Sequence, residues 1–143
     1  MPVQVATLLV VSRATAMALV GTTLDRADQL GIRVSVSVVD PALHLVAFGR
    51  SDGASPHGIE SSRRKANTAA AKGLATGWMV GDLALSLPLA AGNALTNVRG
   101  GLPLVVDGTR VAGMGVAGGT EEEDEALALW ALSKVSGPGT EEP

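Results

Sequence analysis

The sequence of 143 residues has no cysteine and no tyrosine, and its aromatic side chains are limited to Phe48, Trp78 and Trp130. The absence of cysteine excludes disulfides, thiolate metal ligands and a cysteine nucleophile. It also fits a cytoplasmic location, which we predict. Because large aromatics are scarce, the core has to be built from valine, leucine and alanine. The eighteen glycines allow secondary-structure elements to approach closely.

Positive charge and long hydrophobic runs are also scarce. The net charge is −3, whereas a protein that binds nucleic acid needs a basic face. We therefore predict that the chain has no nucleic-acid partner. The apolar N-terminus has no basic segment before it and is interrupted by Arg13, which argues against a signal peptide or a membrane span. The length fits one domain. We place this domain at 1–136 and predict a flexible tail over 137–143, where glycine and proline gather.

The first third of the chain predicts a helix followed by a hairpin. Apolar residues at helical spacing predict a helix over 4–30, ending at Gly31. Valine and isoleucine then alternate with polar residues, which predicts a strand over 32–38. The Asp40-Pro41 pair predicts a turn, and the short connection makes the next strand, at 43–49, antiparallel to the first.

The middle third predicts a second helix and then an irregular stretch. We expect the helix over 56–72, with Ser55 as its N-cap and Pro56 at its first position. Glycine recurs after this helix, and we expect short elements there: one or two helices, near 82–86 and 89–94, and then a strand near 95–98.

The last third predicts a hairpin and a final helix. Two apolar runs, 102–106 and 109–117, flank an Asp-Gly pair, which is a strong hairpin signal. Thr120 and Glu123 have the spacing of a capping box, so the last helix should begin there and end near Val135. The predicted order is α-β-β-α-β-β-β-α. This order favours an α+β fold with helices packed on an antiparallel sheet.

Three segments in this order resemble one known family. They are VSVSVVDPALHLVAFGRSDGA, IESSRRKANTAA and RGGLPLVVDGTRVAGMGVAGGTEEEDEA. Their order and spacing are similar to those of the haem-binding, GlcG-like family, also called DUF336 or HbpS-like. The resemblance implies a profilin-like fold with a five-stranded antiparallel sheet flanked by helices. It also implies homo-oligomers, commonly dimers that assemble further. Some members bind haem, so haem is one cofactor to consider.

The chain has two histidines, His44 and His57. Either imidazole has the chemistry to ligate a haem iron or to act as a general base near neutral pH. The alternatives are that His44 is a hydrogen-bonded turn or sheet residue and that His57 is an exposed loop residue.

Helical spacing places His57, Ser61 and either Arg64 or Lys65 along one stripe of the second helix. A stripe with these cations could receive a carboxylate or haem propionates, unless it is simply a solvated helix face. For Lys65 we weigh an ion pair with Asp40 or Asp52 against a role as an anchor for a substrate carboxylate.

Two further clusters are weaker signals. Arg99 precedes Gly100 and another glycine, a pattern that can bind an anion through backbone N–H groups, although a turn into a strand explains it equally well. The acidic run from Glu121 to Glu125 is explained by helix capping rather than by a metal site.

These observations leave three functional hypotheses. The first is a homo-oligomeric protein that binds haem or another amphiphilic metabolite through six residues: His57, Ser61, Arg64, Lys65, Arg99 and Gly100. The second is a small acid–base enzyme, such as a cyclase, isomerase or hydratase. Its base would be His57 or His44, and Lys65 or Arg99 would stabilise charge. The third is an accessory oligomer that acts through a protein partner.

Overall fold

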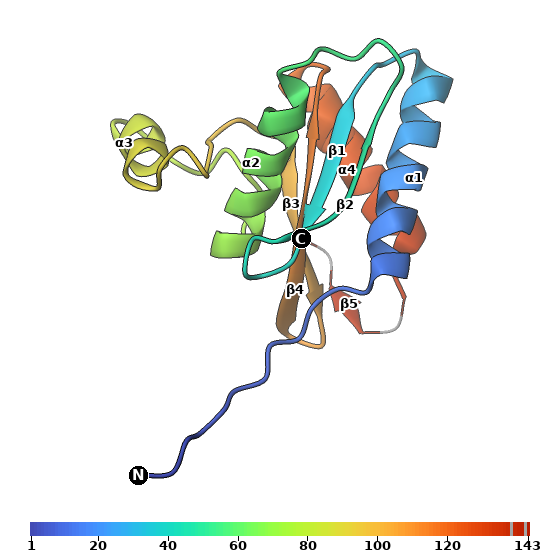
Figure 1. The fold of residues 1–143 in the computed structure, drawn as a ribbon. Helices are drawn as coiled ribbons and strands as arrows, with labels where there is room; N and C mark the ends of the chain where they lie inside the picture. The colour runs from blue at the N-terminus through green and yellow to red at the C-terminus, as the bar shows by residue number, and fades with distance from the viewer. Residues whose placement is uncertain (138, 142) are drawn as a thin grey trace.

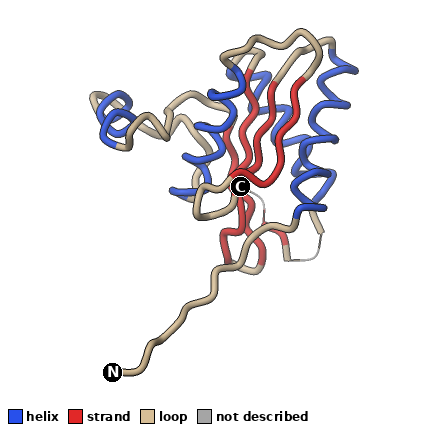
Figure 2. The backbone as a smooth tube through the Cα atoms, viewed as in Figure 1, coloured by secondary structure: helices blue, strands red, loops and turns tan. Residues whose placement is uncertain are grey.

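The computed structural model describes residues 1–137, 139–141 and 143. Its helices are α1 (Arg13–Leu30), α2 (Gly58–Lys72), α3 (Leu83–Ala90) and α4 (Glu121–Val135). Its strands are β1 (Ser35–Val39), β2 (Leu45–Arg50), β3 (Gly101–Val106), β4 (Thr109–Ala117) and β5 (Thr140–Glu141). The strands form one antiparallel sheet in the order β2-β1-β4-β3-β5 (Figure 2). This confirms the α+β class and the profilin-like arrangement.

The sheet is covered on both faces (Figure 1). Helix α2 packs on β4, β1 and β3 on one side, while α1 and α4 pack together on the other. All five residues of β1 are buried as a result. Its alternating serines face α2 rather than solvent, and the hydroxyls of Ser37 and Ser62 lie 2.8 Å apart.

Close packing of α2 on the sheet depends on glycine. A Cβ added at Gly115 would lie 2.1 Å from the carbonyl oxygen of Ser62, and one at Gly113 would lie 2.2 Å from that of Ala66. Neither distance is possible for real atoms, so both positions require glycine. The close backbone approach expected from the glycines of this strand is therefore confirmed, and it sets how near the side chains of α2 lie to the ends of β4.

The first helix is shorter than predicted, because it begins at Arg13 and not at residue 4. The Ser12 hydroxyl accepts a hydrogen bond from the Thr15 N–H at 3.1 Å and caps the helix there. Just before it, the Val11 N–H donates to the Val111 carbonyl oxygen at 3.0 Å, which holds the chain extended against β4. Gly31 ends the helix in the left-handed region, at φ 70°, as predicted.

The second helix also begins later than predicted. Its N-cap is His57, and Ser55 contributes its carbonyl oxygen, not its hydroxyl, to a turn closed by the Gly58 N–H at 3.0 Å. The hydroxyl cap expected at Ser55 is therefore wrong, and Pro56 lies in the turn before the helix.

The irregular stretch holds one helix, α3, where one or two short helices were expected. Residues 95–98 form no strand, because side chains satisfy the nearby backbone groups. The Thr96 N–H donates to the Thr68 hydroxyl, and the Asn97 amide bonds both the N–H and the carbonyl of Met79. The fifth strand is instead β5, within the segment predicted as a tail, and it pairs with β3.

Candidate functional site

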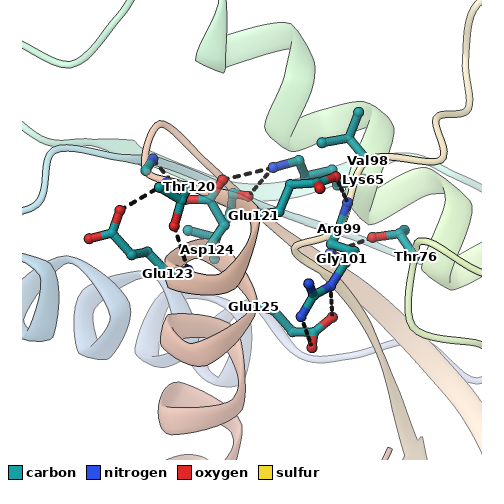
Figure 3. Close-up of polar contacts among 12 residues, drawn as sticks. Lys65, Thr76, Val98, Arg99, Gly101, Thr120, Glu121, Glu123, Asp124 and Glu125 are labelled. Atoms are coloured by element: carbon teal, nitrogen blue, oxygen red, sulfur yellow. Dashed lines mark hydrogen bonds and ion pairs between the residues drawn. The ribbon is translucent and has the colours of Figure 1, made fainter.

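A buried ion pair links α2 to the start of α4 (Figure 3). Lys65 is 2% exposed, and its Nζ donates to the Asp124 carboxylate at 2.9 Å and to the Val116 carbonyl oxygen at 2.7 Å. Asp124 also accepts the Gly119 N–H at 2.8 Å. The expected pairing of Lys65 with Asp40 or Asp52 is wrong.

The ion pair forms one wall of a cavity of about 220 Å³, here called the polar cavity. Four residues of the α2 stripe line it: His57, Ser61, Arg64 and Lys65. Asp124 and the two glycines that follow β4 also line it. The structure therefore brings the stripe residues together around one space. An ammonium group has three donors, and Lys65 uses two of them on the groups just described.

Arg99 does not line the polar cavity, because its guanidinium group binds acidic side chains of α4 (Figure 3). It contacts Glu125 through Nη2 at 3.0 Å and Nε at 3.3 Å, and Glu122 through Nη1 at 3.3 Å. The hydrogen bonds that Arg99 donates to the Glu125 carboxylate, reinforced by its negative charge, raise the pKa of Arg99 above the ordinary value. This guanidinium group therefore ties the segment before β3 to helix α4.

Gly100 is buried behind the ion pair and does not line the polar cavity either. A Cβ there would lie 2.5 Å from the Val116 carbonyl oxygen and 3.0 Å from Lys65 Nζ. Its φ of 124° also disfavours any other residue. Glycine at this position leaves room for the Lys65 ammonium group.

The two histidines lie in different places. His44 sits in the turn between β1 and β2, with its side chain 81% exposed and its Nδ1 3.6 Å from Asp40 Oδ2. The whole length of β2 separates this turn from the loop that leads to His57. Of the residues considered for an acid–base enzyme, His57 and Lys65 thus share a cavity and His44 lies apart. Across the described residues, no group of three or more histidine, aspartate or glutamate side chains is placed to hold a metal ion.

A second cavity, of about 520 Å³, opens between α3 and the body of the protein, and is here called the apolar cavity. Leu85, Leu89 and Leu95 contribute to its walls. It shares four residues with the polar cavity: Arg64, Thr96, Val98 and Glu121. The two cavities are therefore contiguous, with Arg64 at their junction.

Sequence reasoning missed Asp124 and the apolar cavity. The acidic run does contain the predicted capping box, in which the Thr120 hydroxyl accepts the Glu123 N–H and the Glu123 carboxylate accepts the Thr120 N–H. The carboxylate of Asp124 takes no part in this cap. An acidic residue beyond those that the cap requires was therefore the feature of the sequence that pointed to a further partner for Asp124. For the apolar cavity, the available indication was the apolar composition of residues 74–98, where Asp82 is the one charged residue.

The chain is similar to known proteins both in sequence and in fold. The family model described as "Haem degrading protein HbpS-like" matches residues 11–133. The chain belongs to the HbpS-like family. Protein GlcG of Escherichia coli strain K12 is 33% identical over 117 residues, which cover 78% of this chain and 84% of GlcG.

Solved structures of HbpS and of PduOC match almost the whole chain. A double mutant of HbpS from Streptomyces reticuli superposes with a TM-score of 0.84 at 28% identity, covering 96% of this chain and 98% of that one. A PduOC–haem complex superposes with a TM-score of 0.84 at 27% identity, covering 94% of this chain and all of the other. None of the helices in the described part of this HbpS-like chain has the length and apolar character that a membrane span requires.

Proposed function

We propose that this HbpS-like chain binds an anionic amphiphile, with haem as the first candidate. The observation that carries the proposal is the junction of the two cavities at Arg64. An acidic group would occupy the polar cavity, and an apolar body would extend into the apolar cavity under α3. Small-molecule sites commonly combine apolar walls with a few convergent polar groups in this way.

The acidic group would be held by the side chains of α2. Arg64 is half-buried and forms no ion pair with another described residue, so its guanidinium fork remains available to a carboxylate. The remaining donor of Lys65, with the Ser61 hydroxyl, would complete the contacts. Asp124 is already neutralised by Lys65, so it opposes an incoming anion only weakly.

The residues present fit haem. Haem carries two propionates, which Arg64 and Lys65 would receive, and an apolar ring, which would span the junction with one edge against the leucines of the apolar cavity. Without cysteine or tyrosine, an imidazole is the natural iron ligand, and His57 is the histidine that lines the polar cavity. The family description and the PduOC–haem complex support the choice of haem as first candidate. We further propose that the protein works in the cytoplasm as a homo-oligomer.

The test compares iron-free protoporphyrin with its dimethyl ester, by fluorescence titration of wild type and Arg64→Gln. The two probes share the ring but only the first carries carboxylates. Loss of a charge-assisted hydrogen bond should weaken protoporphyrin binding about tenfold, equivalent to about 1.4 kcal/mol. Binding of the ester should be weaker in wild type and unchanged by the substitution. Equal losses for both probes, or no binding of protoporphyrin to wild type, would overturn the proposal.

A further inference from the structure

Another cavity, of about 510 Å³, lies on the side of the sheet that faces away from α2. It opens between the end of α1 and the first half of α4, and is here called the indole cavity because Trp130 lines it. Its other large apolar residues are Leu30, Ile32 and Leu127. It shares no residue with the polar or the apolar cavity, so it is separate from the site proposed above.

The indole cavity has a cation at one end and a carboxylate at the other. Helices α1 and α4 pack against each other in opposite directions (Figure 1). At the basic end, the guanidinium carbon of Arg26 lies 4.3 Å from the centroid of the Trp130 ring. At the acidic end is Glu123, about two helical turns, or about 10 Å, before Trp130 on α4. Its carboxylate already accepts the Thr120 N–H at 2.9 Å.

The basic end carries positive charge that the described chain does not neutralise. Lys134 Nζ lies 4.4 Å from the same ring centroid, so two cations contact one indole. Neither forms an ion pair with a described residue. Among the described residues, the one hydrogen-bond partner of Arg26 is the Gln29 amide oxygen, at 3.1 Å. A guanidinium group has five donors in a fork that matches a carboxylate, so an anion is the group this end would bind.

We infer that the indole cavity binds a small aromatic carboxylate, with the carboxylate on Arg26 and the rings against Trp130 and Leu127. Aromatic pairs are favourable beyond the area that they bury, and Leu127 supplies a buried apolar surface beside the indole. The size favours a small molecule over a protein segment. The volume is typical of small-molecule sites, and the span of two helical turns matches one or two rings.

The test is fluorine NMR of protein labelled with 5-fluorotryptophan, because the chain has two tryptophans. Trp78 lines none of the cavities described above and is the internal control, and Trp78→Phe assigns the two resonances. The probe is 2-naphthoate, and its control is 2-naphthalenemethanol, which has the same rings and no charge. We expect 2-naphthoate to shift the Trp130 resonance saturably and to leave Trp78 unmoved. Half-saturation should come at about 1 mM or below, the affinity that a typical ligand efficiency gives for a two-ring acid.

Two variants test the assigned cation. Arg26→Gln should raise the half-saturating concentration of 2-naphthoate about tenfold, through loss of a charge-assisted hydrogen bond, and leave that of the alcohol unchanged. Arg13→Gln removes the same charge from an exposed position at the start of the same helix, and should change neither. An unaltered Trp78 resonance shows that each variant is folded.

Three results would overturn the inference. The first is the absence of a saturable Trp130 shift with 2-naphthoate. The second is equal affinity for the acid and the alcohol, or equal losses in the two variants, because the carboxylate would then not be held by Arg26. The third is a Trp130 resonance that moves with protein concentration alone, which would show that a protein surface covers the cavity instead.

Discussion

Lys65 Nζ lies 2.9 Å from Asp124 Oδ2, and both side chains are almost fully buried. The pair joins the middle of α2 to the first turn of α4, and the carbonyl oxygen of Val116 completes it. Removing charges from water is costly, so such a pair is retained only where geometry and further hydrogen bonds compensate. Here it also sets the electrostatics of the polar cavity, since it neutralises the one buried carboxylate in the wall.

Lys65→Met should lower the free energy of unfolding by about 3–5 kcal/mol, because it leaves Asp124 buried without its cation. Adding Asp124→Leu should recover much of this loss, since the unpaired charge is then gone. Arg63→Met, at an exposed position of the same helix, is the control and should change stability by less than about 0.5 kcal/mol. Urea denaturation followed by circular dichroism measures all four proteins. Equal effects of Lys65→Met and Arg63→Met would contradict a stabilising role for the pair.

Gly115→Ala should destabilise the protein by about 2–3 kcal/mol, because its Cβ would collide with the backbone of α2 and push the helix off the sheet. Gly21→Ala is the matched substitution within α1, where nothing lies within 4 Å of the new Cβ. It should be neutral or stabilise by up to about 1 kcal/mol, as alanine favours a helix interior. Thermal unfolding separates the two cases. A neutral Gly115→Ala would show that α2 packs more loosely than described.

Arg99→Gln should leave porphyrin affinity unchanged, although the sequence suggested Arg99 as a ligand contact. Its guanidinium group is bound to Glu125 and Glu122 and lies outside the polar cavity. Arg64→Gln, which removes the same functional group from the cavity junction, should weaken binding in the same titration. If Arg99→Gln loses as much affinity as Arg64→Gln does, the prediction is wrong and Arg99 contacts the ligand.

Removal of residues 137–143 should lower the free energy of unfolding by only about 1–2 kcal/mol. The described residues of this segment contribute the two residues of β5 and a few exposed hydrogen bonds, such as that from the Gly108 N–H to the Glu141 carboxylate. Guanidinium titration of the shortened chain checks this. A loss of several kcal/mol would show that the segment predicted as a flexible tail is an integral part of the domain.

Local patterns predicted most of the fold. The hairpin over β3 and β4, the capping box at Thr120 and the exit of α1 at Gly31 all follow from residues close together in sequence. The prediction failed where a tertiary contact competes with local preference. The chain before Ser12 is extended because Val11 bonds β4, and a single residue's bond to a strand cannot be read from helical spacing.

The site was predictable only in part, for a related reason. The stripe of His57, Ser61, Arg64 and Lys65 follows from the period of a helix, which holds wherever the helix packs. The partner of Lys65 lies 59 positions away, on an element whose place is set by the order of strands in the sheet. Arg99 was assigned to the ligand because its guanidinium chemistry suits anions, and the protein's own carboxylates satisfy that chemistry first.

The most direct test of the central claim is a haemin titration followed by absorbance, on wild type, His57→Ala and His44→Ala. The two variants remove the same group, one from the polar cavity and one from a distant exposed turn. We expect a saturable shift of the Soret band for wild type and His44→Ala, with the shift lost or strongly altered for His57→Ala. No saturable shift with wild type, or a shift that depends on His44 and not on His57, would contradict it.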